Sequence, residues 1–349
     1  MNSKAKVLVI LSPGFASSEA DSSCLPMQQS FVRSISKIDP TISVMVLSLH
    51  YPFVKSCYNW FGVSVRSFNG KNKGGINAMF LKRQVWRALH RIHQEMEIIG
   101  LLSFWMGECA SIGQRFAQRE GLRHFSWLMG QDARPKNKYA ARFSKRGNEV
   151  IALSDFLTEE FERNYGVRPA RVVYPGIDRN TEGSVHRDIE LLGVGSLIPL
   201  KRYEVFLEVV AVIKKRIPAI RAVLVGDGPE QENLKNRAKA LGVEDNLEFV
   251  GSIGHDEVLR MMQRARILLH PSSYEGFPGV CQEALSCGAH VISFCRAMNK
   301  DIHQWHIVAS SQDMVHRAIG LLSDPDTRYN AVEFQPMSST AHQIMSCYL

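Results

Sequence analysis

The chain lacks several features that would assign it at once to a common class of protein. No run of about 18 apolar residues occurs in its 349 residues, so the sequence predicts no transmembrane helix. The first apolar run ends at Ser12-Pro13-Gly14, and its shortness is typical of a buried strand rather than of a signal peptide. No internal repeat or low-complexity tract stands out. These absences favour a globular protein, and the length favours two domains.

The cysteines also exclude more than they indicate. There are seven of them, an odd number, and no two stand in a Cys-x2-Cys pair. This pattern argues against both a zinc site and a disulfide framework. We expect reduced thiols in a cytoplasmic enzyme.

Acidic residues are scarce in the first half of the chain. Residues 1–170 hold 23 Lys and Arg against 13 Asp and Glu, whereas residues 171–349 hold 19 against 21. Two basic clusters lie within 82–91 and 134–146. Such clusters commonly form a solvated face, but they also suit anionic lipid head groups. Nucleic acid lacks support, because no helix-turn-helix signal, zinc-finger spacing or aromatic-rich RNA-binding strand occurs.

Short apolar runs alternate with amphipathic stretches along the whole chain, which predicts strands alternating with helices. Such alternation implies parallel sheets with right-handed crossovers. The expected strands are 7–11, 44–49, 101–105, 125–129, 150–153, 171–174, 191–195, 222–226, 247–250, 267–270 and 290–293. In the second half, the expected helices are 204–216, 230–241, 256–264, 280–286 and 311–322.

A polar stretch divides the two series of strands and helices. It follows Tyr174-Pro175-Gly176-Ile177-Asp178 and predicts a linker at 179–188. The fold class is therefore α/β, with two doubly wound, Rossmann-like domains at 1–178 and 189–325. Because ligands of such folds bind at the carboxyl ends of strands, we expect a site in a cleft between the domains.

The stretch Glu275-Gly-Phe-Pro-Gly-Val-Cys-Gln-Glu283 is the most informative motif. Two carboxylates bracket a glycine-containing loop that follows an expected strand and opens a helix. The loop amides and the helix N-terminus suit phosphate oxygens, and the carboxylates suit sugar hydroxyls. The motif therefore favours a nucleotide sugar. The alternative is that Glu283 is simply an acid in the first turn of a helix.

This motif resembles the Glu-x7-Glu motif of the retaining GT-B glycosyltransferases of family 4, the group 1 glycosyltransferases. The resemblance implies that Glu275 lies by the donor sugar and that Glu283 binds the ribose. It also implies that a C-terminal segment, 326–349, crosses back to the first domain. The resemblance runs from the first strand to about Leu322 and is most specific within 191–288.

A second motif opens the second domain, where the family has Val-Gly-Arg-Leu, four residues and Lys-Gly. Lys201 matches the lysine that clamps the donor diphosphate in relatives, but Ser196 stands in place of the arginine. A serine hydroxyl supplies neither the charge nor the fork of a guanidinium. Arg202 is the candidate to compensate. The alternative for Lys201 is a surface lysine at a turn.

Further donor-binding residues are assigned by the same resemblance. Gly226-Asp227-Gly228-Pro229 matches a Gly-x-Gly-Pro element, in which Asp227 is expected to cap a helix. The loop after Phe249 lies against the base in relatives. The donor-binding candidates are Gly14, Arg202, Gly251, Ser252, Gly276, Phe277, Pro278, Gly279, Val280 and Glu283.

In the first domain, candidates follow the expected strands. Asp132 stands near the position where many relatives carry a histidine, so it joins Lys201 and Glu275 as a catalytic candidate. Glu108 and Arg134 are acceptor-binding candidates. An Asp132–Arg134 pair that only fixes a loop is the alternative. For His270, the sequence favours a core histidine over one that faces a cleft.

The resemblance implies a hexosyltransferase that moves a hexose, with retention, from a UDP- or GDP-linked sugar to an acceptor hydroxyl. It implies no metal and no cofactor beyond the nucleotide diphosphate sugar as co-substrate. The expected acceptor is a glycan or lipid-linked sugar in cell-surface polysaccharide or glycolipid biosynthesis. The basic domain predicts peripheral association with the inner face of the membrane, and no nucleic-acid partner is expected. The alternative is a catalytically weak nucleotide-sugar-binding subunit of a glycosylation complex. A sugar epimerase of the same fold lacks support, because its acid and base residues cannot be placed.

Overall fold

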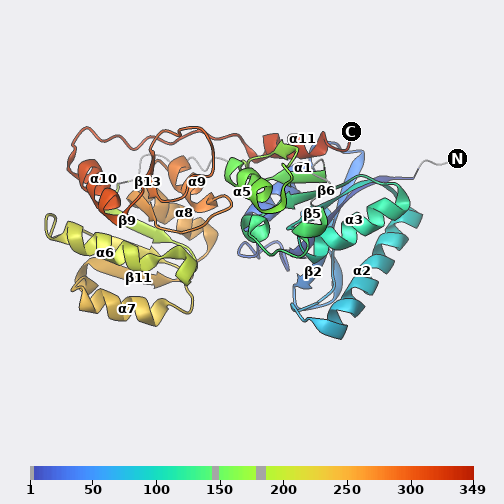
Figure 1. Cartoon of the computed structure of the whole chain (residues 1–349), viewed down its shortest axis with the longest axis horizontal. Coiled ribbons are helices and arrows are strands. Elements are labelled where there is room, and N and C mark those ends of the chain that lie inside the picture. The colour runs from blue at the N-terminus through green and yellow to red at the C-terminus, as the bar shows by residue number, and fades with distance from the viewer. Residues whose placement is uncertain (1–3, 144–148, 178–185) are drawn as a thin grey trace. The chain divides into compact units, whose positions relative to one another are not determined.

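A computed structural model describes residues 4–143, 149–177 and 186–349 (Figure 1). The chain divides into two compact units. Unit 1 comprises Met1–Gly176 and Gln335–Leu349, and unit 2 comprises Ile177–Phe334. No helix of the described residues is both long and apolar enough to cross a bilayer.

Unit 1 is built on an eight-stranded sheet with the order β3-β4-β2-β1-β5-β6-β7-β8. Its centre, β1, is buried from Val7 to Ser12, because an inner parallel strand is covered on both faces. All the strands expected in this half are present. The strands are β1 (Lys6–Gly14), β2 (Ile42–Tyr51), β3 (Ser56–Trp60), β4 (Val63–Ser67), β5 (Glu97–Phe104), β6 (His124–Leu128), β7 (Val150–Ala152) and β8 (Arg171–Val172).

The hairpin of β3 and β4 was not predicted from the sequence. Its two strands pair antiparallel, Ser56 opposite Ser67, and β4 then pairs parallel to β2. Each strand has only five residues, and buried and exposed positions alternate along it. Two such short runs resemble ordinary loop sequence, and only their pairing makes them strands.

Helices cover the sheet of unit 1. The elements are α1 (Pro26–Ile35), α2 (Gly75–Glu95), α3 (Glu108–Glu120), α4 (Ala140–Phe143), α5 (Asp155–Tyr165), α11 (Met337–Met345) and the 3-10 turn η1 (Gly130–Ala133). Helix α5 shows how the sequence sets the ends. The Oγ of Ser154 accepts the Leu157 N–H at 3.1 Å, and Gly166 in the left-handed region ends the helix.

The C-terminal segment of the chain packs on unit 1. The Tyr348 hydroxyl donates to the Leu101 carbonyl at 2.8 Å, and the Thr340 hydroxyl donates to the Tyr174 carbonyl at 2.8 Å. Gly100 makes this possible, since a Cβ there would lie 2.2 Å from the Tyr348 ring. The final residues are therefore part of the fold of unit 1.

A buried histidine on β6 should make the stability depend on pH. His124 is 4% exposed, and burial lowers its pKa to about 3 from 6.5. The native state thus excludes a proton that the unfolded chain takes up below about pH 6.5, so stability is full above that pH and falls as the pH decreases. Between pH 7 and pH 5 the loss from this residue is about 2 kcal/mol.

Urea unfolding of the protein and of His124→Gln at both pH values measures this contribution. The variant should lose about 2 kcal/mol less between pH 7 and pH 5, whatever its stability at pH 7. An equal loss in both proteins would show that His124 does not titrate as its burial requires.

Unit 2 contains a wholly parallel six-stranded sheet with the order β11-β10-β9-β12-β13-β14. The strands are β9 (Ile189–Val194), β10 (Ala222–Val225), β11 (Leu247–Gly251), β12 (Ala265–His270), β13 (His290–Ser293) and β14 (Trp305–Ile307). The five expected strands are confirmed, and β14 was missed because three residues carry no periodicity. The helices are α6 (Tyr203–Lys214), α7 (Gln231–Ala240), α8 (His255–Arg264), α9 (Gly279–Ser286) and α10 (Ser311–Ser323), with 3-10 turns η3 (Pro199–Lys201) and η4 (Glu244–Asn246).

The predicted linker falls largely on residues 178–185, which lie outside the described part of the chain. Its last residue, Asp188, belongs to the fold of unit 2. The carboxylate accepts hydrogen bonds from Arg264 at 2.6 and 2.8 Å and from Arg221 at 2.6 Å. These arginines lower the pKa of Asp188 to about 2.

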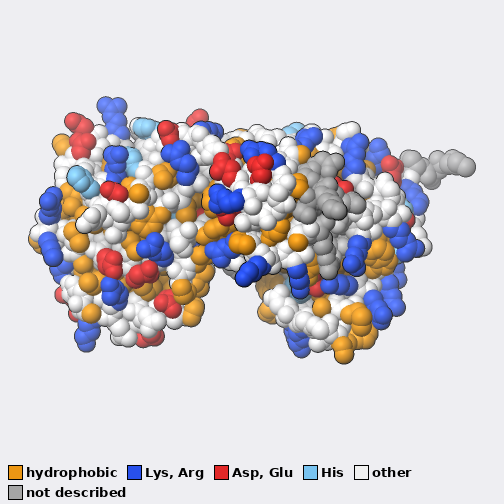
Figure 2. Space-filling model, viewed as in Figure 1, with side chains coloured by type: hydrophobic (Ala, Val, Ile, Leu, Met, Phe, Trp, Pro, Cys, Tyr) orange, Lys and Arg blue, Asp and Glu red, His pale blue; other side chains and the backbone are white. Residues whose placement is uncertain are grey.

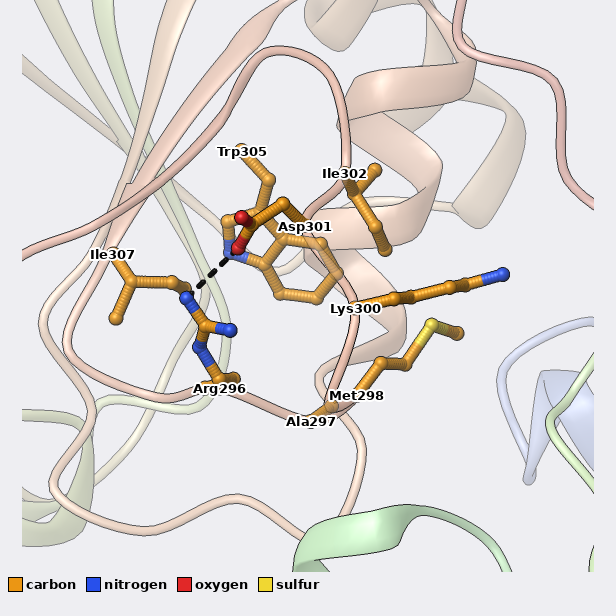
Figure 3. A pocket seen from close by; sticks show the side chains of 8 residues that line it. All are labelled: Arg296, Ala297, Met298, Lys300, Asp301, Ile302, Trp305 and Ile307. Atoms are coloured by element: carbon orange, nitrogen blue, oxygen red, sulfur yellow. Dashed lines mark hydrogen bonds and ion pairs between the residues drawn. The ribbon is translucent and has the colours of Figure 1, made fainter.

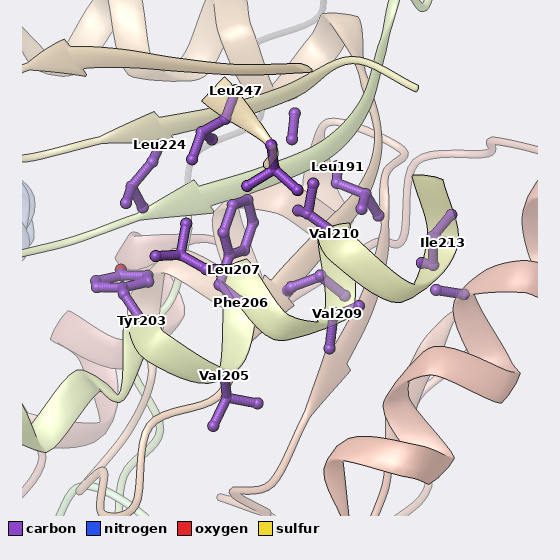
Figure 4. Close-up of a cluster of buried hydrophobic side chains, with 14 of the residues drawn as sticks. Leu191, Tyr203, Val205, Phe206, Leu207, Val209, Val210, Ile213, Leu224 and Leu247 are labelled. Carbon is purple, nitrogen blue, oxygen red and sulfur yellow. The ribbon is translucent and has the colours of Figure 1, made fainter. Parts of the chain in front are cut away.

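The core between α6 and the sheet holds unit 2 together. Figure 4 shows Phe206, Leu207 and Val210 of α6 pointing toward Leu191 and Leu224 on the strands. All five side chains are at most 1% exposed. Because α6 begins directly after η3, this packing fixes the loop that carries Lys201.

Candidate functional site

Each sheet has one point where the strand order reverses. In unit 2 the chain runs from β9 outward to β11 and then returns to the other side of β9 with β12. In unit 1 the same reversal occurs between β1 and β5. Open α/β sheets bind ligands at the carboxyl ends of the strands beside such a point. The two places to inspect are therefore the loops after β9 and β12 and the loops after β1 and β5.

In unit 2, this position brings Lys201 and Glu275 together. Lys201 follows β9 and Glu275 follows β12, and the Lys201 Nζ lies 2.5 Å from the Glu275 Oε1. The side chains are 19% and 15% exposed. Two residues that are 74 positions apart in the sequence thus form one ion pair at the carboxyl edge of the sheet.

His270, the last residue of β12, lies beneath this pair. Its Nε2 is 3.2 Å from the Glu275 Oε1. The side chain is 2% exposed, and burial lowers its pKa although the contact with Glu275 opposes this. Burial alone would raise the pKa of Glu275, but His270 and the Lys201 charge outweigh it and lower the pKa to about 2. Glu275 is therefore a carboxylate at any physiological pH.

The loop after Glu275 leads into α9. Gly276 and Pro278 are buried, Phe277 and Val280 are partly buried, and Gly279 is exposed at the first position of the helix. The Cys281 N–H donates to the Pro278 carbonyl at 2.9 Å, which closes the first turn. A helix that starts at this edge places its positive end beside Glu275 and Lys201.

Glu283, one turn into α9, has a partner that the sequence analysis did not single out. Its Oε1 lies 2.9 Å from the Nε2 of His255, the first residue of α8. The contact with Glu283 raises the pKa of His255. No sequence pattern connects the two residues, since they are 28 positions apart on different helices. His255 is thus an added candidate for the donor site.

The other donor-binding candidates of unit 2 make contacts of their own. The Arg202 guanidinium lies 5.4 Å from the centroid of the Phe294 ring, and its Nε lies 3.7 Å from the Glu204 Oε1. Gly251 ends β11, where its carbonyl accepts the Gly226 N–H at 2.8 Å. Ser252 and Ser196 are exposed. The structure does not bring the Arg202 guanidinium to the carboxylate of Glu275.

In unit 1, Gly14 and Glu108 lie on opposite sides of the reversal. Gly14 is buried at the end of β1, where its carbonyl accepts the Ser12 hydroxyl at 2.5 Å. Glu108 opens α3 after β5, and its two oxygens each lie 3.3 Å from a nitrogen, one of His50 and one of Lys82. These two partners lower the pKa of Glu108 despite burial. Glu108 thus takes part in a charged group at the carboxyl edge of the sheet.

Asp132 joins the loops after β5 and β6. Its Oδ2 accepts the N–H groups of Met106 at 2.8 Å and Met129 at 2.9 Å, and the side chain is 6% exposed. Burial raises its pKa to about 7 in spite of these bonds. Arg134 follows at the end of η1, half-buried. Asp132 therefore fixes the loop, which is the structural role that the alternative gave it. It does so by accepting hydrogen bonds from main-chain amides.

A small pocket lies beside β13 and β14, where the sequence analysis assigned no residue (Figure 3). An ion pair of 3.0 Å between Arg296 and Asp301 crosses it. The lining residues are Arg296, Ala297, Met298, Lys300, Asp301, Ile302, Trp305 and Ile307.

The sequence of unit 2 matches a known protein family. A family model described as glycosyl transferases group 1 matches residues 177–334. The gpi3 subunit of phosphatidylinositol N-acetylglucosaminyltransferase from Schizosaccharomyces pombe is 39% identical over 93 residues, 27% of this chain and 20% of that protein. An uncharacterized glycosyltransferase from Haemophilus influenzae is 36% identical over 104 residues, 30% of this chain and 29% of that protein. The matches thus span less than a third of these two relatives.

Solved structures resemble the whole chain. Sucrose-phosphate synthase from Thermosynechococcus elongatus superposes with a TM-score of 0.74 at 13% identity, covering 98% of both chains. HepE from Anabaena, crystallised with UDP and glucose, gives a TM-score of 0.68 at 17% identity, over 98% of this chain and 95% of that one. These likenesses confirm the expected GT-B fold of two parallel-sheet domains. By sequence, unit 2 is similar to the group 1 glycosyltransferases over residues 177–334, and by fold the whole chain is similar to GT-B enzymes.

Proposed function

We propose that the protein is a retaining, metal-independent glycosyltransferase of family 4. It moves a hexose from a UDP- or GDP-linked sugar to an acceptor hydroxyl. The observation that carries the proposal is the Lys201–Glu275 ion pair at the strand-order reversal of unit 2, beside the start of α9. A cation, a carboxylate and a helix N-terminus at one point match the diphosphate and the sugar of such a donor.

The protein would act by positioning and by electrostatic stabilisation. When the donor binds, Lys201 exchanges its contact with Glu275 for the diphosphate, and Glu275 turns to a sugar hydroxyl. The bond from the anomeric carbon to the diphosphate oxygen breaks as the acceptor oxygen bonds on the same face. The departing diphosphate takes the acceptor proton. Lys201 and the amides from Gly276 to Val280 stabilise the negative charge that develops.

A panel titration tests the donor class. The purified protein is titrated with UDP, GDP, ADP and their hexose conjugates by thermal shift and calorimetry. UDP comes first, because HepE was crystallised with UDP and glucose. We expect a selective response to one nucleotide, and product analysis should show net transfer with retained anomeric configuration. No response to any nucleotide would contradict the proposal.

Glu283→Ala should weaken binding of the selected nucleotide about 10- to 150-fold, because a carboxylate hydrogen bond to the ribose is worth roughly 1.5–3 kcal/mol. A 2′,3′-dideoxy nucleotide should bind the protein and the variant equally weakly. Glu257→Ala is the matched control, since Glu257 is an exposed glutamate of α8 paired with Arg260 at 3.1 Å. A Glu283→Ala variant that binds as tightly as the original would remove the ribose role.

A second candidate function is a catalytically weak subunit that binds a nucleotide sugar within a glycosylation complex. Ser196 favours it, because an exposed hydroxyl replaces the expected cation. Nucleotide binding without net transfer or sugar isomerisation, followed by gained transfer in Ser196→Arg, would support this candidate.

The acceptor is proposed to be a glycan or lipid-linked sugar of cell-surface polysaccharide or glycolipid biosynthesis. The excess of Lys and Arg in residues 1–170 supports a cytoplasmic protein held peripherally on the anionic inner face of the membrane.

A further inference from the structure

The carboxyl edge of the unit 1 sheet carries exposed apolar side chains. Phe53 and Val54, 56% and 64% exposed, follow β2. Ile76, Met79 and Phe80, 69%, 48% and 51% exposed, occupy the first turns of α2, which follows β4. Because β2 and β4 are parallel, both groups lie at the same edge. We call these five residues the apolar rim.

A hydrogen bond connects the two halves of the apolar rim. The Lys55 Nζ donates to the Gln84 Oε1 at 2.7 Å, which places the loop after β2 beside α2. Ile76, Phe80 and Gln84 are four residues apart and share one face of the helix. The loop residues Phe53 and Val54 therefore lie near the exposed face that carries Ile76 and Phe80.

The apolar rim also adjoins a predicted acceptor-binding residue. Lys82, on the same helix, lies 3.3 Å from Glu108 at the carboxyl end of β5. A molecule seated on the rim would thus be close to the acceptor edge of unit 1.

The chain segment that carries the rim has charges of one sign. Residues 41–94 contain no Asp or Glu, and their excess of positive charge equals the net +8 of the whole chain. Figure 2 shows orange apolar and blue basic side chains next to each other over the lower end of α2. The basic residues of this segment are Lys55, Arg66, Lys71, Lys73, Lys82, Arg83, Arg87 and Arg91.

We propose that the apolar rim inserts into an anionic lipid bilayer while the surrounding Lys and Arg contact the lipid phosphates. Exposed apolar side chains next to basic ones match the interface of a negatively charged membrane. A second copy of the chain does not fit, because the basic side chains next to the rim would face their own like charges. The acceptor would then be a lipid-linked molecule presented at this edge, a step that rests on the proposed function.

Flotation of the full chain with vesicles tests the proposal. The chain should float more strongly with phosphatidylcholine–phosphatidylglycerol vesicles than with pure phosphatidylcholine. A measurable fraction should remain bound at high salt, because insertion is not screened. Binding that is lost completely at high salt, or equal binding to both vesicles, would overturn the proposal.

Variants separate the two contributions. Ile76→Ser with Phe80→Ser should lower vesicle affinity at least tenfold at both salt concentrations. Lys71→Gln with Lys73→Gln should lower it about 25-fold at low salt and little at high salt, from roughly fivefold per charge. Val212→Ser is the control, since Val212 is 44% exposed on unit 2. Unchanged affinity in the Ile76–Phe80 variant would show that the rim does not insert.

Nucleotide titration of the same variants keeps this inference separate from the proposed function. All four rim and lysine positions belong to unit 1, whereas the nucleotide candidates other than Gly14 belong to unit 2. If the protein binds vesicles but no nucleotide, the membrane-binding surface is supported and the proposed transferase activity is contradicted. If the protein binds a nucleotide and transfers the sugar but does not bind vesicles, the transferase activity is supported and the membrane-binding surface is contradicted.

Discussion

Lys201→Ala should lower the rate of glycosyl transfer at least tenfold. The variant removes the cation that faces the departing diphosphate, and a charge-assisted contact of this kind is worth roughly 1.5–3 kcal/mol, or about 10- to 150-fold in rate. It also leaves Glu275, 15% exposed, with only His270 beside it. Initial rates with saturating donor and a soluble acceptor measure the effect.

Glu275→Gln distinguishes the two ways in which Lys201 could act. If Lys201 only positions Glu275, the double variant should be no slower than Glu275→Gln alone. If Lys201 also binds the diphosphate, it loses a competing partner in Glu275→Gln, so the free nucleotide diphosphate should bind as tightly as before or more tightly. Lys201→Ala should bind it more weakly. We expect the second outcome.

The control for Lys201 is Lys235→Ala. Lys235 is a lysine of the same unit whose ion pair with Glu232, at 3.3 Å, is exposed. Such a pair contributes little, so transfer should be unchanged. Turnover near the original value in Lys201→Ala would place Lys201 outside the site.

The motif residues of unit 2 could be anticipated from sequence because their position depends on local rules. A loop after a buried strand and before a helix lies at the carboxyl edge of a parallel sheet. Lys201 and Glu275 both satisfy that rule. That β9 and β12 are neighbours depends on strand order, which follows from tertiary packing and from no single segment. The resemblance to a family implied it, and the periodicity alone did not.

Other contacts were beyond sequence reasoning for a physical reason. His255 meets Glu283 across two helices that pack on the same sheet, and the Asp132 carboxylate binds main-chain amides, which every residue possesses. Neither partner has a sequence signal. The hairpin of β3 and β4 is similar, because its strands are defined by pairing with each other and with β2. Long-range partners of common groups are the part of a site that a single sequence does not contain.

The structure shows that the glycines of the Gly-x-Gly-Pro element allow two loops to pack closely together. Gly226 has a φ of +137°, and a Cβ there would lie 1.9 Å from the Gly195 carbonyl oxygen. Gly228 also lies tightly against Leu197, since a Cβ there would lie 2.4 Å from the Leu197 carbonyl oxygen. The loops after β9 and β10 thus meet backbone to backbone, and the glycines are required by that approach as well as by any ligand.

Gly226→Ala should therefore destabilise unit 2 by at least about 3 kcal/mol, since it combines a clash with main-chain atoms and a strained φ. Urea unfolding, followed by a probe of unit 2 such as nucleotide binding, measures the loss. Gly254→Ala is the matched control. Gly254 has a φ of −65° and open space around its Cβ position, so that variant should stay within about 1 kcal/mol of the original.

Gly226→Ala should also impair glycosyl transfer under conditions where the variant is still folded. The Leu197 N–H donates to the Asp227 carbonyl at 2.9 Å, and the Glu230 N–H donates to the Leu197 carbonyl at 3.0 Å. These bonds hold the loop that continues to Lys201, so a displacement at Gly226 moves the cation away from Glu275. A Gly226→Ala protein with the original stability would mean that the two loops can separate. If Gly226→Ala keeps the original stability but loses transfer, the close contact between the two loops positions Lys201 without stabilising the fold.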